Sequence, residues 1–316
     1  MEKNLAKGSA LRNIVTFSAP FLLANLLQTL YGMADLFIVG QFNGAASISG
    51  VSIGSQVMHM LTVMIIGLTM GTTVRIGHAV GRHDLPGTRQ IVGNSIVLMM
   101  GVSVILAVIL FFAADGIAAV MLTPLVAMDE TRLYLQICFL GLPLICAYNV
   151  ISAIFRGYGD SRTPMYFVLV ACICNILLDY LFIGGCGMRA AGAAAGTVAA
   201  QGISVLFALY VTVRRNLVEL SRSDFQLRSD ILDQVIRTGL PICLQDGCIQ
   251  ISFVIITVIA NSRGVEIAAA VGITEKIIGF FFLVPSSLLA SVSAICRSVR
   301  GCRRICRRRR LCCIPA

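Results

Sequence analysis

Residues 20–40 read PFLLANLLQTLYGMADLFIVG, an apolar run long enough to cross a bilayer, which needs about 20 helical residues. Within this run, Gln28, Tyr31 and Asp35 follow one another at steps of three and four residues. This spacing puts an amide, a phenol and a carboxylate on one face of a helix. Because an ionisable side chain is costly in contact with lipid, we expect this face to point into the protein and to be functional.

The whole chain has the composition of a membrane protein. Of its 316 residues, 57% are hydrophobic and 13% are charged, whereas soluble domains carry about 25% charged residues. The mean hydropathy is +0.88. These values argue against a nucleic-acid-binding protein, a secreted disulfide scaffold or a cytosolic enzyme. The net charge of +10 does not indicate an acidic partner, because residues 297–316 hold eight of the 25 Lys and Arg and no Asp or Glu, which leaves +2 for the remainder.

Charged residues divide the chain into apolar segments that are each long enough for a transmembrane helix. The sequence therefore predicts an all-α polytopic membrane protein with eight helices, at residues 13–40, 51–74, 90–113, 131–155, 164–183, 191–213, 238–260 and 267–296. Lys and Arg gather in alternate loops, and short cytoplasmic loops retain positive charge. We expect a multi-pass protein of the cell (inner) membrane with both termini in the cytoplasm.

The acidic residues that fall at membrane depth are Asp35, Asp179, Asp246 and Glu275. Asn175 lies one turn before Asp179, and Thr197 follows a run of Ala and Gly that lets neighbouring helices approach closely. Each carboxylate is either a structural cap that reaches water or part of a proton or cation site. Two carboxylates with hydrogen-bonding companions on separate helices favour the cation site, because a carboxyl group removed from water is a reversible proton carrier.

A weak internal repeat appears when the chain is compared with itself at a shift of about 220 residues. It aligns Pro20 with Pro241, and the first two predicted helices with the last two. Six helices separate the copies, so both copies have the same orientation. We therefore expect an N-lobe of six helices at 1–215, a cytoplasmic inter-lobe linker at 216–237, the first two helices of a C-lobe at 238–296, and a Cys- and Arg-rich tail at 297–316.

Five segments of residues 10–296 form a recognisable set: Pro20 to Gly40, Gly71 to Asp84 (GTTVRIGHAVGRHD), Arg156 to Pro164 (RGYGDSRTP), Asn175 to Asp179 (NILLD) and Ala268 to Ile277 (AAAVGITEKI). Together they resemble the multidrug and toxic compound extrusion (MATE) transporters, and most of all the DinF-like branch. The resemblance implies a secondary active exporter rather than an enzyme. Two six-helix lobes would face a central cavity and alternate between inward-open and outward-open states, and this chain would be C-terminally truncated.

The resemblance also implies roles for individual residues. The cation-binding or proton-relay residues would be Asp35, Asn175, Asp179 and Thr197. The substrate cavity would include Gln28, Tyr31, Tyr134 and Asn149, and Pro20 would be the hinge of the first helix. We expect no metal and no cofactor other than the coupling ion, H⁺ or Na⁺. The expected partners are organic cations or drugs and membrane lipid, without nucleic acid, and the expected state is a monomer.

Alternative interpretations remain for the whole chain and for its tail. A flippase for lipid-linked oligosaccharides would carry more cationic residues along the cavity, and a chain with only two C-lobe helices could be an inactive truncated product. The tail, RSVRGCRRICRRRRLCCIPA, stands where the repeat predicts another loop. It is explained by an out-of-frame reading or, alternatively, by a polybasic segment that binds anionic lipid.

Overall fold

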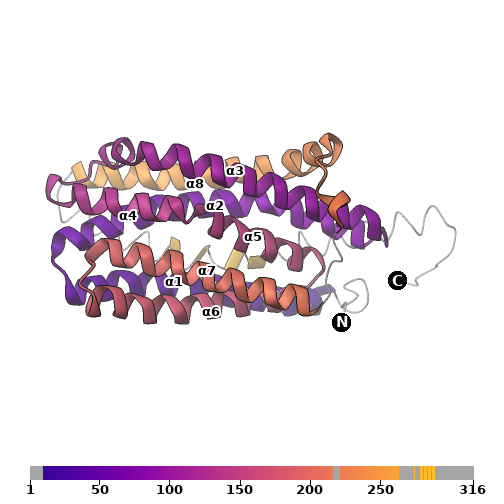
Figure 1. Ribbon diagram of the computed structural model, residues 1–316, viewed down its shortest axis with the longest axis horizontal. Coiled ribbons are helices and arrows are strands. Elements are labelled where there is room, and N and C mark those ends of the chain that lie inside the picture. The colour runs from indigo at the N-terminus through magenta and orange to yellow at the C-terminus, as the bar shows by residue number, and fades with distance from the viewer. Residues whose placement is uncertain are drawn as a thin grey trace.

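The computed structural model describes residues 10–215 and 221–262, with a few positions between 274 and 288. The described residues are almost entirely helical and contain no strand. The α-helices are α1 (Ala10–Phe42), α2 (Ala45–Val80), α3 (Leu85–Val120), α4 (Met128–Leu140), α5 (Leu142–Gly157), α6 (Arg162–Asp179), α7 (Arg189–Arg214) and α8 (Ser229–Ser262). Figure 1 shows them lying along one common axis as a single bundle. The prediction of an all-α protein is confirmed.

Six of these helices are long and apolar enough to cross a membrane, and counting α4 and α5 as one bent span gives seven. Each of the first seven predicted helices has a counterpart, which confirms the multi-span prediction over the described part of the chain. The tail, Glu275 and most of the helix predicted at 267–296 lie outside the described residues.

Most helices extend beyond their predicted bounds. The second helix, α2, ends at Val80, whereas the prediction ended it at residue 74. The helix α8 begins at Ser229 instead of residue 238, so residues 229–237 of the predicted linker are helical. The prediction ended each helix near its flanking charges. A helix does not stop at a charge, because its backbone hydrogen bonds continue as long as the chain keeps helical dihedrals.

The span predicted at 131–155 is not one helix but two, bent by 48° at Gly141. Pro143 explains the break, because proline has no N–H to continue the ladder and its ring clashes with the preceding turn. The bend also brings Gly141 against α7. A Cβ at position 141 would overlap Val198 Cγ2, so only glycine fits this approach.

A close seam joins α2 to α8. A Cβ on Gly67 would lie 2.8 Å from the Cα of Cys243, and a Cβ on Gly71 would overlap the carbonyl oxygen of Val235. From the other side, a Cβ on Gly239 would overlap the carbonyl oxygen of Leu68. Small residues at these positions let the two backbones touch, which is how membrane helices pack tightly.

The described part of the connection between α7 and α8, residues 221–228, is docked on α3. It contains the short helix η3 (Arg222–Phe225), which is capped by reciprocal hydrogen bonds between Ser221 and Asp224. The side chain of the buried Asn94 holds this segment by hydrogen bonds to the segment's backbone. The Asn94 Nδ2 group donates to the carbonyl oxygens of Asp224 (3.3 Å) and Gln226 (3.1 Å), and Asn94 Oδ1 accepts from the Arg228 N–H (2.7 Å).

We expect Asn94→Leu to release this docked segment. The loss of several hydrogen bonds at a buried site should cost about 2 kcal/mol, which corresponds to an open population about 30-fold larger. Limited trypsin digestion of the purified protein should then cleave after Arg222 and Arg228 correspondingly faster, because cleavage tracks the open population when opening is fast.

Ser103→Ala is the matched control, because Ser103 is also buried on α3 but donates to Met100 of its own helix. Its cleavage rate should equal that of the unmodified chain. Equal cleavage rates in Asn94→Leu and Ser103→Ala would show that Asn94 does not hold the segment.

Candidate functional site

The polar face of α1 points into the protein, as its spacing predicts. Asp35 is only 3% exposed, whereas the neighbouring Leu30, Met33 and Phe37 are exposed large apolar side chains. The side chains of Gln28 and Tyr31 are partly buried. The face that carries the carboxylate therefore packs against protein, and the apolar face is left for lipid.

The second carboxylate comes from α6, which lies against α1. Asn175 and Asp179 are 2% and 0% exposed. Directly after Asp179 the chain forms a π-helical turn, Tyr180–Gly185. A π-turn places an extra residue in the helix and is frequent at functional sites. The second carboxylate thus lies at the junction between a regular helix and an irregular turn.

The small residues of α7 make room for this carboxylate. A Cβ on Gly196 would overlap Asp179 Oδ1, so glycine at this position leaves room for the carboxyl where α7 packs against α6. The next residue, Thr197, projects its hydroxyl between the other two helices. It accepts a hydrogen bond from Asn175 Nδ2 (3.4 Å) and donates to Asp35 Oδ2 (3.2 Å).

Three helices thus bring together Asp35, Asn175, Asp179 and Thr197, the residues that the sequence assigns to the cation site. The carboxyl groups of Asp35 and Asp179 lie close enough to interact with each other. We refer to these four residues as the acidic cluster. No Lys, Arg or His of the described chain forms an ion pair with either carboxylate.

The acidic cluster has more acceptors than donors. Among the described residues, no donor reaches Asp35 Oδ1, Asn175 Oδ1 or either carboxylate oxygen of Asp179. Buried carboxylates without a compensating positive charge are strongly unfavourable. Carboxylate, amide and hydroxyl oxygens are the ligands that hard cations prefer. The arrangement is therefore suited to hold a proton or a small hard cation.

Of the four residues expected to line the substrate cavity, some lie near the acidic cluster and one does not. The Tyr31 hydroxyl lies beside the side chains of Gln28 and Gln201, and both Tyr31 and Tyr134 are near enough to Asp35 to interact with it. Tyr134 is buried and its ring fills the space left by Gly54. The fourth residue, Asn149, is also buried, but its Nδ2 donates to the carbonyl oxygen of Ile145 on its own helix, and no described contact links it to the acidic cluster.

Sequence reasoning missed Gln201, which is 7% exposed and stands beside Tyr31. A signal for it exists, because Gln201 follows Thr197 by four residues and so shares its face of α7. The hinge candidate, Pro20, lies inside α1 as predicted, and the helix continues through it.

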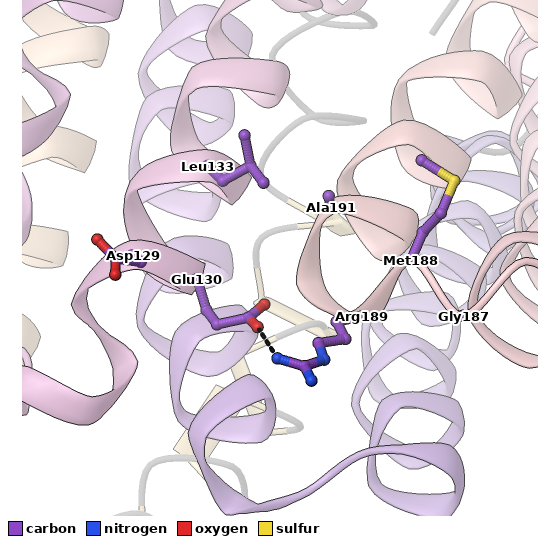
Figure 2. A pocket seen from close by; sticks show the side chains of 7 residues that line it. All are labelled: Asp129, Glu130, Leu133, Gly187, Met188, Arg189 and Ala191. Carbon is purple, nitrogen blue, oxygen red and sulfur yellow. Dashed lines mark hydrogen bonds and ion pairs between the residues drawn. The ribbon is translucent and has the colours of Figure 1, made fainter.

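A shallow pocket of about 280 Å³ lies between the first turns of α4 and α7, and Figure 2 shows its lining. Glu130 Oε1 pairs with Arg189 at 3.4 Å, and Glu130 Oε2 accepts the backbone N–H of Ala190 at 3.2 Å. Both carboxylate oxygens of Glu130 therefore bind the start of α7 and connect it to α4. This pocket is a structural contact and shares no residue with the acidic cluster.

The comparisons with known proteins identify the family of the chain. The family model described as MatE matches residues 20–181, which is half of the chain and contains Asp35, Asn175 and Asp179. The chain belongs to the MatE family. Two curated relatives are the probable multidrug resistance protein YpnP of Bacillus subtilis (strain 168), which is 28% identical over 274 residues, and the multidrug export protein MepA of Staphylococcus aureus (strain NCTC 8325 / PS 47), which is 23% identical over 289 residues.

These alignments cover 87% and 90% of this chain but only 61% and 64% of the relatives. The chain thus spans about three fifths of the length of its curated MatE relatives. Among solved structures, a MOP superfamily transporter from Pyrococcus furiosus matches with a TM-score of 0.87 at 25% identity, over 95% of this chain and 67% of that one. An outward-facing multidrug resistance MATE family transporter matches with a TM-score of 0.85 at 25% identity, over 95% and 68%.

We expect Gly196→Ala to destabilise this MatE protein. Its Cβ would force the Asp179 carboxyl to move, and overpacking of this kind costs about 1–3 kcal/mol. Gly202→Ala on the same helix is the matched control, because its Cβ would meet only Leu144 Cδ1 at an ordinary 3.6 Å. The control should stabilise by about 0.5–1 kcal/mol, since alanine is the better helix former.

Thermal unfolding of the purified protein in detergent measures both effects. The melting temperature should fall for Gly196→Ala and rise for Gly202→Ala. In an Asp179→Ala background, Gly196→Ala should lose its penalty, because the overlapping atom is gone. A penalty of unchanged size in that background would disprove the contact between Gly196 and Asp179.

Proposed function

We propose that this chain acts as a secondary active multidrug exporter that exchanges H⁺ or Na⁺ for amphipathic organic compounds by alternating access. The observation that carries the proposal is that Asp35 and Asp179 are both buried without an ion-pair partner among the described residues. Thr197 links Asp35 to Asn175 by hydrogen bonds, and neither oxygen of Asp179 has a donor in the described part of the chain. Such a couple is suited to bind and release a cation reversibly. The names of its MatE relatives, a multidrug resistance protein and a multidrug export protein, support drugs as the cargo.

The proposed cycle begins with the protein open to the outside. A cation binds between Asp35 and Asp179 and removes the repulsion between their charges. The part of α1 beyond Pro20 then shifts relative to α6 and α7, and the drug leaves. The return to the inward-open state releases the cation on the cytoplasmic side. Coupling requires that cation and drug favour opposite states or compete for one site.

The proposed setting follows from the charge distribution. The basic loops would lie in the cytoplasm, with both termini on that side of the cell (inner) membrane. A site with two carboxylates in an apolar environment is best suited to organic cations as substrates. The transporter would act as a monomer surrounded by lipid.

Replacement of either carboxylate should stop export. Cells that lack their own efflux pumps and express the full 316-residue chain should export a cationic dye under an inward gradient of H⁺ or Na⁺. We expect export to be lost in Asp35→Asn and in Asp179→Asn at equal amounts of protein in the membrane. The amide cannot take up a proton or balance a cation.

Asp115→Asn is the matched control, because Asp115 is an exposed carboxylate on α3 that pairs with Arg132, away from the acidic cluster. Its export should be unchanged. Collapse of the H⁺ gradient and of the Na⁺ gradient in separate experiments identifies the coupling ion. The proposal fails if the unmodified chain exports no dye, or if both cluster variants still export it.

A further inference from the structure

A buried amide on α7 extends the acidic cluster by one turn. Gln201 is 7% exposed and follows Thr197 by four residues, so its side chain lies on the same helix face. One turn of an α-helix advances about 5.4 Å. Gln201 is therefore placed beside the cation site but too far along the helix to be another ligand of the ion that Asp35 and Asp179 hold.

The side chain of Gln201 has a polar neighbour on α1. Tyr31 lies near the Gln201 and Gln28 side chains, and it is also near enough to Asp35 to interact with it. Tyr31 therefore links Gln201 on α7 to the polar face of α1.

The amide oxygen of Gln201, Oε1, is buried and has no donor among the described residues. The same holds for Asp35 Oδ1, Asn175 Oδ1 and both Asp179 oxygens, so three helices that pack together each carry a buried acceptor without a donor among the described residues. A buried unpaired acceptor costs about 1–3 kcal/mol. A single ligand that satisfies all of these acceptors would carry a positive charge and offer an N–H or O–H group one turn away from the carboxylates.

We propose that Gln201 Oε1 accepts a hydrogen bond from an N–H group of the transported cation, and that the chain thereby selects protonated amines over quaternary ammonium compounds of the same shape. Both classes carry the charge that attracts them to Asp35 and Asp179. Only the protonated amine has an N–H to donate. A quaternary compound would leave the amide oxygen buried and unpaired, which is how a site rejects a ligand that lacks a donor. The inference rests on the proposed export function.

Binding of two probes to the purified full chain in detergent tests this selectivity. The probes are an aromatic tertiary amine, at a pH where it is protonated, and its N-methyl quaternary analogue. The unmodified chain should bind the tertiary amine about three- to tenfold more tightly, the ratio expected for one hydrogen bond. Gln201→Met keeps the side-chain volume but removes the acceptor, so the two affinities should become equal.

Two further variants separate this role from a general loss of structure. Gln201→Glu keeps an acceptor at the same place and should retain the preference for the tertiary amine. Ser204→Ala removes a different buried hydrogen bond on α7, from Ser204 Oγ to the Phe167 carbonyl oxygen, and should leave the ratio unchanged.

The inference is overturned if the unmodified chain binds both probes equally, if it binds neither, or if Gln201→Met keeps the preference of the unmodified chain. None of these outcomes decides whether the chain exports drugs, because export is tested separately through Asp35 and Asp179 in cells. Loss of dye export in the unmodified chain would instead remove the proposed function itself.

Discussion

Two carboxyl groups that interact in the membrane interior without a paired cation are the constraint on which the rest of the structure depends. Asp35 and Asp179 come from different helices, and the hydroxyl of Thr197 on a third helix bridges Asp35 to Asn175. Gly196 leaves room for the Asp179 carboxyl, because a Cβ at this position would overlap Asp179 Oδ1. Among the described residues, no Lys, Arg or His forms an ion pair with either carboxylate of the acidic cluster. In the proposed function, a bound proton, ion or cationic substrate supplies the positive charge.

The same bundle shows how α8 is attached to the helices that carry the cluster. Glycines bring the backbones of α2 and α8 into contact, and Asn94 holds the preceding segment on α3 through backbone hydrogen bonds. The described part of the connection between α7 and α8, residues 221–228, is therefore a docked segment. Movement of α8 relative to α2 would have to break or slide these contacts.

The sequence predicted the buried side of α1 because its polar residues follow helical spacing, and it predicted the partners Asn175, Asp179 and Thr197 from spacing and family resemblance. It did not predict the break at Gly141, although Pro143 gave a signal, because proline is common in unbroken membrane helices. The docking of the linker on Asn94 depends on contacts between residues about 130 positions apart, which no local pattern reveals. Gln201 was missed although its spacing from Thr197 was visible. Its importance appears only when Tyr31 on another helix is placed beside it.

The central claim is that the acidic cluster holds the coupling cation and that this cation opposes drug binding. Affinity of the purified chain for a cationic drug, measured across a series of pH values and Na⁺ concentrations, tests it directly. By thermodynamic linkage, a cation that favours release of the drug must also lower the affinity of the chain for the drug. We predict that acidification or added Na⁺ lowers the affinity of the unmodified chain and that this dependence is absent in Asp35→Asn. Drug affinity that is insensitive to both cations, or equally sensitive in the variant, would contradict the account.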